Sequence, residues 1–310
     1  MRIPSVSLAP TVLASMLTLG ALAPVQAQTT TLGTRQALST PNVALTTHAS
    51  STWKAYTRAA DHPDSVTLPL QFITTAKGQR LAVLVSMPAN AAGQPVPGQF
   101  PAILTQTAYR IDVGQLLGSV AGTGNTLLVG GQDKFMNRRG YVSVAVDVLG
   151  SGMSSGEAQL LGAQEQEAYG EAVAWVTRQP WFNGQLGLAG TSYLGISSLF
   201  TAQQQHPAVK AVFAQVPMGD AFRGTVGPGG LLNAKFISLW LPLTQSLSVG
   251  NALAIQRYPQ YADQLRAAEA QHVAAIDSWY IPTVDRSLAG EVGYATDDGD
   301  FWATRSPVDG

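Results

Sequence analysis

The chain has 310 residues, enough for one large domain or for one domain with an insertion. Its 18 lysines and arginines nearly balance its 19 aspartates and glutamates, which gives a formal net charge of −1, and only 12% of the residues are charged. Without a cluster of basic residues, nucleic acid and anionic membrane surfaces have little electrostatic support as partners. There is no cysteine, so the fold must rely on core burial. Small, fairly neutral substrates fit this composition best.

The N-terminal segment has the pattern of a secretory signal peptide. Met1 and Arg2 give a positive start, residues 6–24 are mostly apolar, and small residues precede a cleavage site after Ala27. We therefore expect a signal peptide over 1–27, a secreted or periplasmic protein, and no membrane association of the mature form. The following stretch is rich in Thr, Ser and Ala, and we expect a loose arm over 28–66.

The middle of the chain alternates between strand and helix patterns. Period-two and buried apolar runs predict strands over residues 67–75, 80–87, 100–107 and 141–147. A helix is predicted over 163–177, then a strand and a helix on either side of Ser192, then another buried strand over 209–216. This alternation predicts the α/β class, with a mostly parallel sheet and crossover helices.

From residue 224 onward, the strand pattern gives way to helical segments. Helices are predicted over 231–246 and 261–280, as expected of an inserted helical lid. The predicted organisation is a core over 67–223, a lid over 224–300, and a return toward the core over 301–310.

The stretch from Gly190 to Gly195 predicts a nucleophile elbow. A strand pattern leads into Ser192 and a helix pattern leaves it, which suits a serine hydroxyl exposed on a sharp turn. The spacing differs from the common G-x-S-x-G pattern, because Leu194 occupies the second glycine position and Gly195 comes one residue later. A glycine-rich structural turn is the alternative interpretation of these residues alone.

Six segments form an ordered set of motifs along the chain: residues 98–109 (GQFPAILTQTAY), 147–156 (DVLGSGMSSG), Trp175, 179–187 (QPWFNGQLG), 190–195 (GTSYLG) and 300–307 (DFWATRSP). Together they resemble one family, the Xaa-Pro dipeptidyl-peptidase and cocaine esterase-like (CocE/NonD) group of α/β-hydrolases. The resemblance runs from about residue 67 to 310 and implies the α/β-hydrolase fold.

The resemblance implies roles for four residues. Ser192 matches the nucleophile, Tyr109 the tyrosine whose hydroxyl stabilises the oxyanion, and Tyr193 the residue whose backbone N–H is the second donor. Trp240 has a spacing similar to that of a substrate-facing tryptophan, although packing in the lid would explain it equally well. Leu149 stands where relatives commonly have arginine, which puts a salt bridge below the active site in doubt.

No general base can be assigned from the four histidines. His48 and His62 precede the sheet, His206 follows the elbow helix, and His272 is expected on a solvated face of the lid. The acid and histidine motifs of the family are not found before Gly310. We therefore expect a chain that is incomplete at its C-terminus, lacking the last strands, the acid, the histidine and a β-sandwich domain, and inactive by itself.

The leading hypothesis is a secreted serine hydrolase that forms an acyl-enzyme on Ser192 and cleaves a small ester, an amide or an Xaa-Pro-like peptide. Two alternatives stay open: a non-catalytic protein that uses the hydrolase scaffold for binding, and a truncated remnant without a function. No metal-binding or cofactor-binding motif appears, so no metal and no cofactor is expected.

Overall fold

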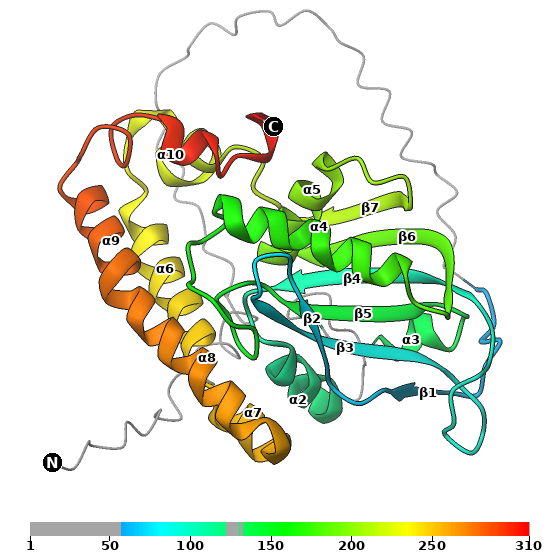
Figure 1. Cartoon of the computed structure of the whole chain (residues 1–310). Helices are drawn as coiled ribbons and strands as arrows, with labels where there is room; N and C mark the ends of the chain where they lie inside the picture. The colour runs from blue at the N-terminus through cyan, green and yellow to red at the C-terminus, as the bar shows by residue number, and fades with distance from the viewer. Residues whose placement is uncertain (1–56, 122–129, 131–132, 310) are drawn as a thin grey trace, which may run out of the picture. The chain divides into compact units, whose positions relative to one another are not determined.

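The computed structural model describes residues 57–121, 130 and 133–309, so the predicted signal peptide and the arm up to residue 56 lie outside the described residues. The described chain is built on one mixed sheet in the order β1-β3-β5-β4-β6-β7, with β2 also paired to β3 (Figure 1). The strands are β1 (Asp64–Thr67), β2 (Gln71–Thr74), β3 (Arg80–Ala89), β4 (Phe100–Thr107), β5 (Val142–Asp147), β6 (Phe182–Thr191) and β7 (Val209–Gln215).

The sheet has an antiparallel part and a parallel part. β1 and β2 both pair antiparallel with β3, and β3 pairs antiparallel with β5. β5, β4, β6 and β7 run parallel to one another, joined by crossovers that include α4 (Ala163–Thr177) and α5 (Tyr193–Gln203). The predicted mostly parallel sheet with crossover helices is therefore present, and its carboxyl-terminal edge gathers the loops after β4, β5 and β6.

The two faces of the sheet are covered by different helices, and β3 shows why. Its residues alternate in direction, so Leu81 and Val83 pack with α4 on one face, while Ala82 and Leu84 pack on the other. That second face is covered by residues from α2 (Ile111–Ala121), α7 (Ala252–Arg257) and α8 (Ala262–Ala275).

The strand predicted over 67–75 is in fact two strands. β1 ends at Thr67 and β2 begins at Gln71, and the residues between them include Pro69, which has no N–H to donate to a ladder. β1 also begins at Asp64, so the last residues of the predicted arm pair with β3.

The prediction that residues 209–216 form a buried strand is wrong. β7 lies at the end of the strand order, and most of its side chains are exposed, including Val212 at 40% and Phe213 at 55%. An apolar run alone does not distinguish a central strand from an edge strand, because that depends on which segments come to lie beside it.

The stretch expected as a lid is helical throughout its described elements, which gather beyond one end of the strands (Figure 1). Helix α6 begins at Ala234, three residues later than predicted, because the Asn233 side chain caps it by accepting from the Phe236 N–H at 3.3 Å. The helix predicted over 261–280 is divided where a π-helical turn follows α8. The elements are η1 (Phe222–Val226), η2 (Pro228–Gly230), α6 (Ala234–Val249), α7, η3 (Pro259–Tyr261), α8, η4 (Ile276–Tyr280), α9 (Ile281–Leu288), α10 (Asp300–Ala303) and η5 (Pro307–Asp309), while the short α3 (Lys134–Asn137) precedes β5.

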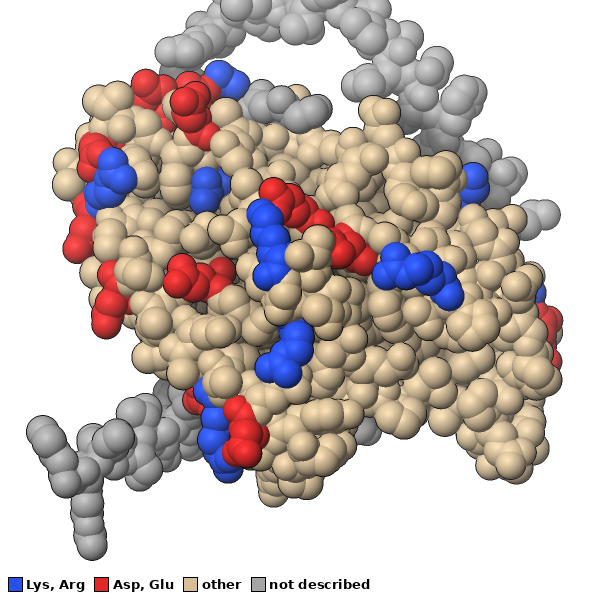
Figure 2. Space-filling view, viewed as in Figure 1, with Lys and Arg blue, Asp and Glu red and all other residues tan. Residues whose placement is uncertain are grey.

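Charged side chains on the face shown in Figure 2 are sparse and of mixed sign, without a continuous basic area. Among the described helices, none combines the length and the apolar character needed to cross a membrane.

Candidate active site

Ser192 occupies the sharp turn between β6 and α5. Its backbone has φ 59° and ψ −124°, a conformation that a residue with a side chain rarely adopts, and the turn is held by a 2.9 Å bond from the Ser192 N–H to the Gln215 carbonyl of β7. Ser192 is half-buried and sits at the N-cap of α5. The structure therefore places this serine as the sequence predicts for a nucleophile elbow.

The two flanking glycines are needed for close packing of α5. A Cβ atom on Gly190 would lie 2.2 Å from the Leu194 Cβ, and one on Gly195 would lie 3.0 Å from the Gln215 carbonyl oxygen. Gly195 therefore lets the helix approach β7, and Gly190 leaves room for Leu194. This explains why the second glycine can come one residue later than in the common pattern.

Tyr109 comes from the loop after β4, and its hydroxyl lies 3.0 Å from the Ser192 Oγ. Two local features direct this side chain: the Tyr109 N–H donates to the Thr107 hydroxyl at 2.8 Å, and the next residue, Arg110, has φ 73°. Arg110 is held in this left-handed conformation by a buried bidentate ion pair with Asp112. The loop after β4 is thus turned so that the tyrosine hydroxyl faces the serine.

Tyr193 is the first residue of α5, so its backbone N–H is one of the N–H groups that have no acceptor within the helix. The positive end of the helix dipole lies at the same position. A carbonyl oxygen near Ser192 could accept from this N–H and from the Tyr109 hydroxyl together. That is the arrangement of an oxyanion hole.

Trp240 comes from α6 and closes one side of the site. Its Nε1 lies 3.5 Å from the Tyr109 hydroxyl oxygen, at the long limit of a hydrogen bond, and its ring stacks on Phe236 with centroids 5.4 Å apart. An indole N–H can only donate. A donor on the tyrosine oxygen leaves the tyrosine proton available for the Ser192 side.

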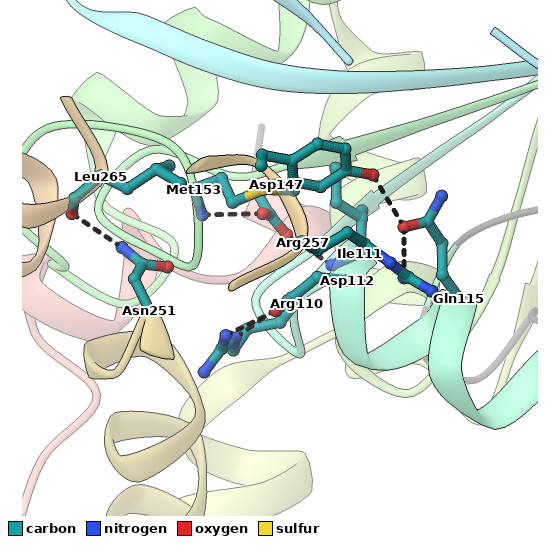
Figure 3. A network of polar contacts seen from close by, with 10 residues as sticks. Arg110, Ile111, Asp112, Gln115, Asp147, Met153, Asn251, Arg257 and Leu265 are labelled. Atoms are coloured by element: carbon teal, nitrogen blue, oxygen red, sulfur yellow. Dashed lines mark hydrogen bonds and ion pairs between the residues drawn. The ribbon is translucent and has the colours of Figure 1, made fainter. Parts of the chain in front are cut away.

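Asp147, the last residue of β5, ties together two loops at the carboxyl edge (Figure 3). Its carboxylate accepts from the Ile111 N–H at 2.8 Å and from the Met153 N–H at 2.9 Å. The side chain is fully buried, and a Cβ on Gly152 would lie only 2.4 Å from it. Burial raises the pKa of Asp147 to about 7, and the neighbouring Asp112 adds to the rise.

A second buried carboxylate, Glu165 of α4, lies below the elbow. It accepts from the hydroxyls of Tyr169 and Tyr193 and from the Leu161 N–H at 2.9 Å. Burial raises the pKa of Glu165, and the three donors and the nearby Arg305 oppose the rise.

Of the histidines in the described ranges, none makes a hydrogen bond with Ser192. His206 lies beyond the far end of α5, where its Nδ1 accepts from the Ala208 N–H at 3.1 Å, and the His62 ring packs edge-on against Phe100. His48 lies outside the described residues.

The expectation that His272 lies on a solvated face is wrong. Its side chain is fully buried, and its Nε2 lies 2.9 Å from the Ser154 carbonyl oxygen in the loop after β5. Alanines surround it in the sequence, and small residues allow close packing as readily as exposure. Burial lowers the pKa of His272.

Among the described residues, there is no group of three or more His, Asp or Glu side chains that could hold a metal ion.

Two parts of this site, Asp147 and Glu165, were missed as site residues by sequence reasoning. Asp147 ends a buried parallel strand and precedes a glycine-rich loop, a position where polar side chains meet at the sheet edge. Glu165 precedes Ala168, Tyr169 and Ala172 at helical spacing, which places it on the buried face of α4. An acidic residue on an apolar helix face was thus the signal in the sequence that could have identified Glu165.

Comparisons with known proteins identify the family and the fold. The family model of the X-Pro dipeptidyl-peptidase (S15 family) matches residues 77–309. A Mycobacterium bovis protein that carries the name serine esterase is 34% identical over 180 residues, which are 54% of this chain and 27% of the relative. The cocaine esterase of a Rhodococcus species is 30% identical over 141 residues, which are 45% of this chain and 23% of the relative. The chain thus spans about a quarter of the length of these relatives.

Solved structures show the same fold. An aminopeptidase from a marine sediment archaeon of the Thaumarchaeota gives a TM-score of 0.54 at 19% identity, over 83% of this chain and 42% of the other. A CocE/NonD family hydrolase from Staphylococcus aureus gives 0.51 at 22% identity, over 66% of this chain and 38% of the other. The predicted α/β-hydrolase fold and the resemblance on which it rests are confirmed. With a match over residues 77–309, this chain belongs to the X-Pro dipeptidyl-peptidase S15 family.

Proposed function

We propose that this protein is a serine hydrolase that cleaves an ester or an amide through an acyl-enzyme on Ser192. One observation carries the proposal: the Ser192 Oγ lies 3.0 Å from the Tyr109 hydroxyl while Ser192 has the strained backbone of an elbow at the start of a helix. A purely structural turn would not require both a strained serine backbone and a tyrosine hydroxyl directed at the serine side chain.

The reaction follows from these groups. The Ser192 oxygen attacks the carbonyl carbon, the carbonyl π electrons move to the oxygen, and the Tyr109 hydroxyl and the Tyr193 N–H donate to the resulting oxyanion. When the tetrahedral intermediate collapses, the alcohol or amine leaves with a proton and the acyl group stays on Ser192. Water then attacks the acyl carbon by the same route and releases the acid.

This cycle needs a general base to take the proton of Ser192. The histidines in the described ranges are His62, His206 and His272, and each has its ring engaged away from the serine. We therefore propose that the 310-residue chain by itself turns over slowly. Loss of the base in a catalytic triad costs on the order of 10⁶ in turnover.

The substrate is proposed to be a small ester, an amide or a short peptide. The names of the relatives, a serine esterase, a cocaine esterase and an aminopeptidase, support this range. The half-buried aromatic rings of Trp240 and Phe236 beside Tyr109 would suit an apolar or aromatic group next to the scissile bond.

Export is also proposed, on the sequence pattern of residues 1–27, so the mature chain would begin at Gln28.

A fluorophosphonate probe tests the nucleophile. Prolonged incubation of the chain should give a single adduct on Ser192, found by peptide mass spectrometry, while hydrolysis of p-nitrophenyl acetate stays close to background. Ser192→Ala should abolish the adduct. Ser246→Ala is the matched control, because Ser246 is exposed on α6 and bonds only to the Leu243 carbonyl of its own helix.

The absence of any adduct on Ser192 would contradict the proposal and would favour a scaffold used for binding. Fast hydrolysis that Ser192→Ala abolishes would keep the nucleophile but overturn the proposal of slow turnover.

A further inference from the structure

The Tyr193 side chain, as distinct from its backbone N–H, touches the other parts of the candidate site. Its ring meets the Tyr109 ring nearly edge-on, with centroids 5.9 Å apart and planes at 66°, and lies 6.5 Å from the Trp240 ring. It is almost fully buried, at 1% exposure. The ring therefore lies against the tyrosine that is proposed to donate to the oxyanion, while its own backbone carries the other donor.

The far end of this ring is bonded to Glu165. The Tyr193 hydroxyl donates to the Glu165 Oε1, and the carboxylate is itself fixed by the Leu161 N–H on Oε2 and by the Tyr169 hydroxyl on Oε1. Glu165 is 3% exposed. Both tyrosine hydroxyls donate to the same Glu165 oxygen, so one acceptor holds the two rings.

A residue near the end of the chain, Arg305, also helps to hold Glu165 in place. Arg305 donates to the carbonyls of Leu160 at 3.0 Å and Gln159 at 3.1 Å, and this holds the loop whose next residue, Leu161, donates to Glu165. The carboxylate is thus fixed from its own helix, from the loop before it, and from the elbow.

We propose that Glu165 is a positioning residue that acts through the Tyr193 ring to hold both oxyanion donors in place. The inference rests on the function proposed for Ser192, Tyr109 and Tyr193. If the hydroxyl end of the ring were released, the ring could tilt against Tyr109, and the Tyr109 hydroxyl would leave its 3.0 Å contact with Ser192. Oxyanion stabilisation depends on donors that are fixed before the charge appears.

The chain offers a matched pair of variants to separate positioning from stability. Tyr193→Phe and Tyr169→Phe each remove one hydroxyl that donates to the same Glu165 oxygen, and both side chains are buried. Only Tyr193 adjoins Ser192 in the chain. A merely structural role of Glu165 should make the two variants alike.

The experiment follows fluorophosphonate labelling of Ser192 in the full chain by mass spectrometry, as the limiting rate constant (kinact) and the half-saturating probe concentration (KI), together with the melting temperature of each variant. A shift of about 1 Å in a catalytic group can cost about 100-fold in rate, so we expect Tyr193→Phe to lower kinact roughly 10-fold with little change in KI. Tyr169→Phe should lower the melting temperature by a similar amount, since it removes one hydrogen bond to the same Glu165 oxygen, but it should leave kinact within about twofold.

Glu165 itself is tested by rescue. Glu165→Gln keeps an oxygen that accepts from the tyrosines and should retain most of kinact, whereas Glu165→Leu should match Tyr193→Phe. The double variant Glu165→Leu/Tyr193→Phe should label no more slowly than either single variant. Should Glu165→Leu fail to fold, the pair of tyrosine variants still decides. Equal kinact values for Tyr193→Phe and Tyr169→Phe would overturn the inference. A wild-type chain that forms no adduct on Ser192 would instead overturn the proposed function, and the inference with it.

Discussion

Asp147 and His272 are buried titratable residues whose pKa values are displaced in opposite directions. Burial raises the pKa of Asp147 to about 7, because the charged carboxylate is disfavoured away from water. Burial lowers the pKa of His272, because here the charged form is the protonated one. The stability of the fold therefore has two opposed dependences on pH.

Asp147 should make the protein less stable as the pH rises. Between pH 3.8, the usual pKa of an aspartate, and about pH 7, Asp147 holds a proton in the folded state that it has lost in the unfolded state. The stability that Asp147 contributes is therefore complete below pH 3.8 and is lost as the pH rises through about 7. From pH 5 to pH 8 the loss amounts to roughly 3 kcal/mol of unfolding free energy, because one bound proton changes that free energy by about 1.4 kcal/mol per pH unit. Urea unfolding of the wild type and of Asp147→Asn at both pH values measures it. The variant should lose less stability over this interval, and parallel losses would contradict the assignment.

His272 should make the protein less stable as the pH falls. Below its usual pKa of 6.5 the unfolded chain takes up a proton that the buried ring does not, so this contribution is present above pH 6.5 and is lost as the pH falls through the depressed folded value. His272→Gln should remove that loss between pH 7 and pH 5 in the same urea measurement. If the unfolding free energy of His272→Gln depends on pH as that of the wild type does, the His272 ring does not take up a proton on unfolding.

At the scale of elements, the contact between β6 and α5 decides the geometry of the elbow. Gly190→Ala would bring a Cβ within 2.2 Å of the Leu194 Cβ and within 2.6 Å of its carbonyl carbon. Because the second atom belongs to the backbone, the helix must shift. Overpacking of this kind typically costs about 1–3 kcal/mol, and the displaced helix should also carry Ser192 away from Tyr109.

Gly187→Ala is the matched control for that change. It lies on the same strand, and its added Cβ would meet only the Ala102 carbonyl oxygen at an ordinary 3.8 Å. We expect its melting temperature and its fluorophosphonate labelling to stay near those of the wild type, while Gly190→Ala loses both. Similar behaviour of the two variants would mean that β6 and α5 can separate without harm to the elbow.

Much of this arrangement could be predicted from the chain, because local patterns determine it. The run into Ser192, the small residues around it and the helix that follows are all encoded within neighbouring residues, and Tyr109 could be found through its motif. The burial of His272 and the exposure of β7 could not, because both depend on segments far away in the sequence that pack against them. The bond from Tyr193 to Glu165 likewise joins two crossover helices whose mutual placement no local pattern gives.

At the scale of the whole molecule, the proposed export makes a direct prediction. Expression of the full chain in a bacterial host with a secretion pathway should yield a mature protein whose N-terminus is Gln28, because the apolar run over residues 6–24 and the small residues up to Ala27 fit a signal peptidase site. Intact mass and N-terminal sequencing of the exported fraction measure this. Ala27→Pro should block cleavage, and an exported protein that keeps Met1 would contradict the proposal.

The exposure of β7 has a dynamic consequence for Ser192. The described ladder on β7 comes from β6 alone, and its Gln215 carbonyl also holds the Ser192 N–H. Edge elements with few buried side chains belong to the parts of a protein that open with the smallest free energy, as exchange of amide hydrogens with solvent would report. Each local opening of β7 removes the acceptor that fixes the elbow. We therefore expect the orientation of Ser192 to depend on how often β7, a strand at one end of the described strand order, opens.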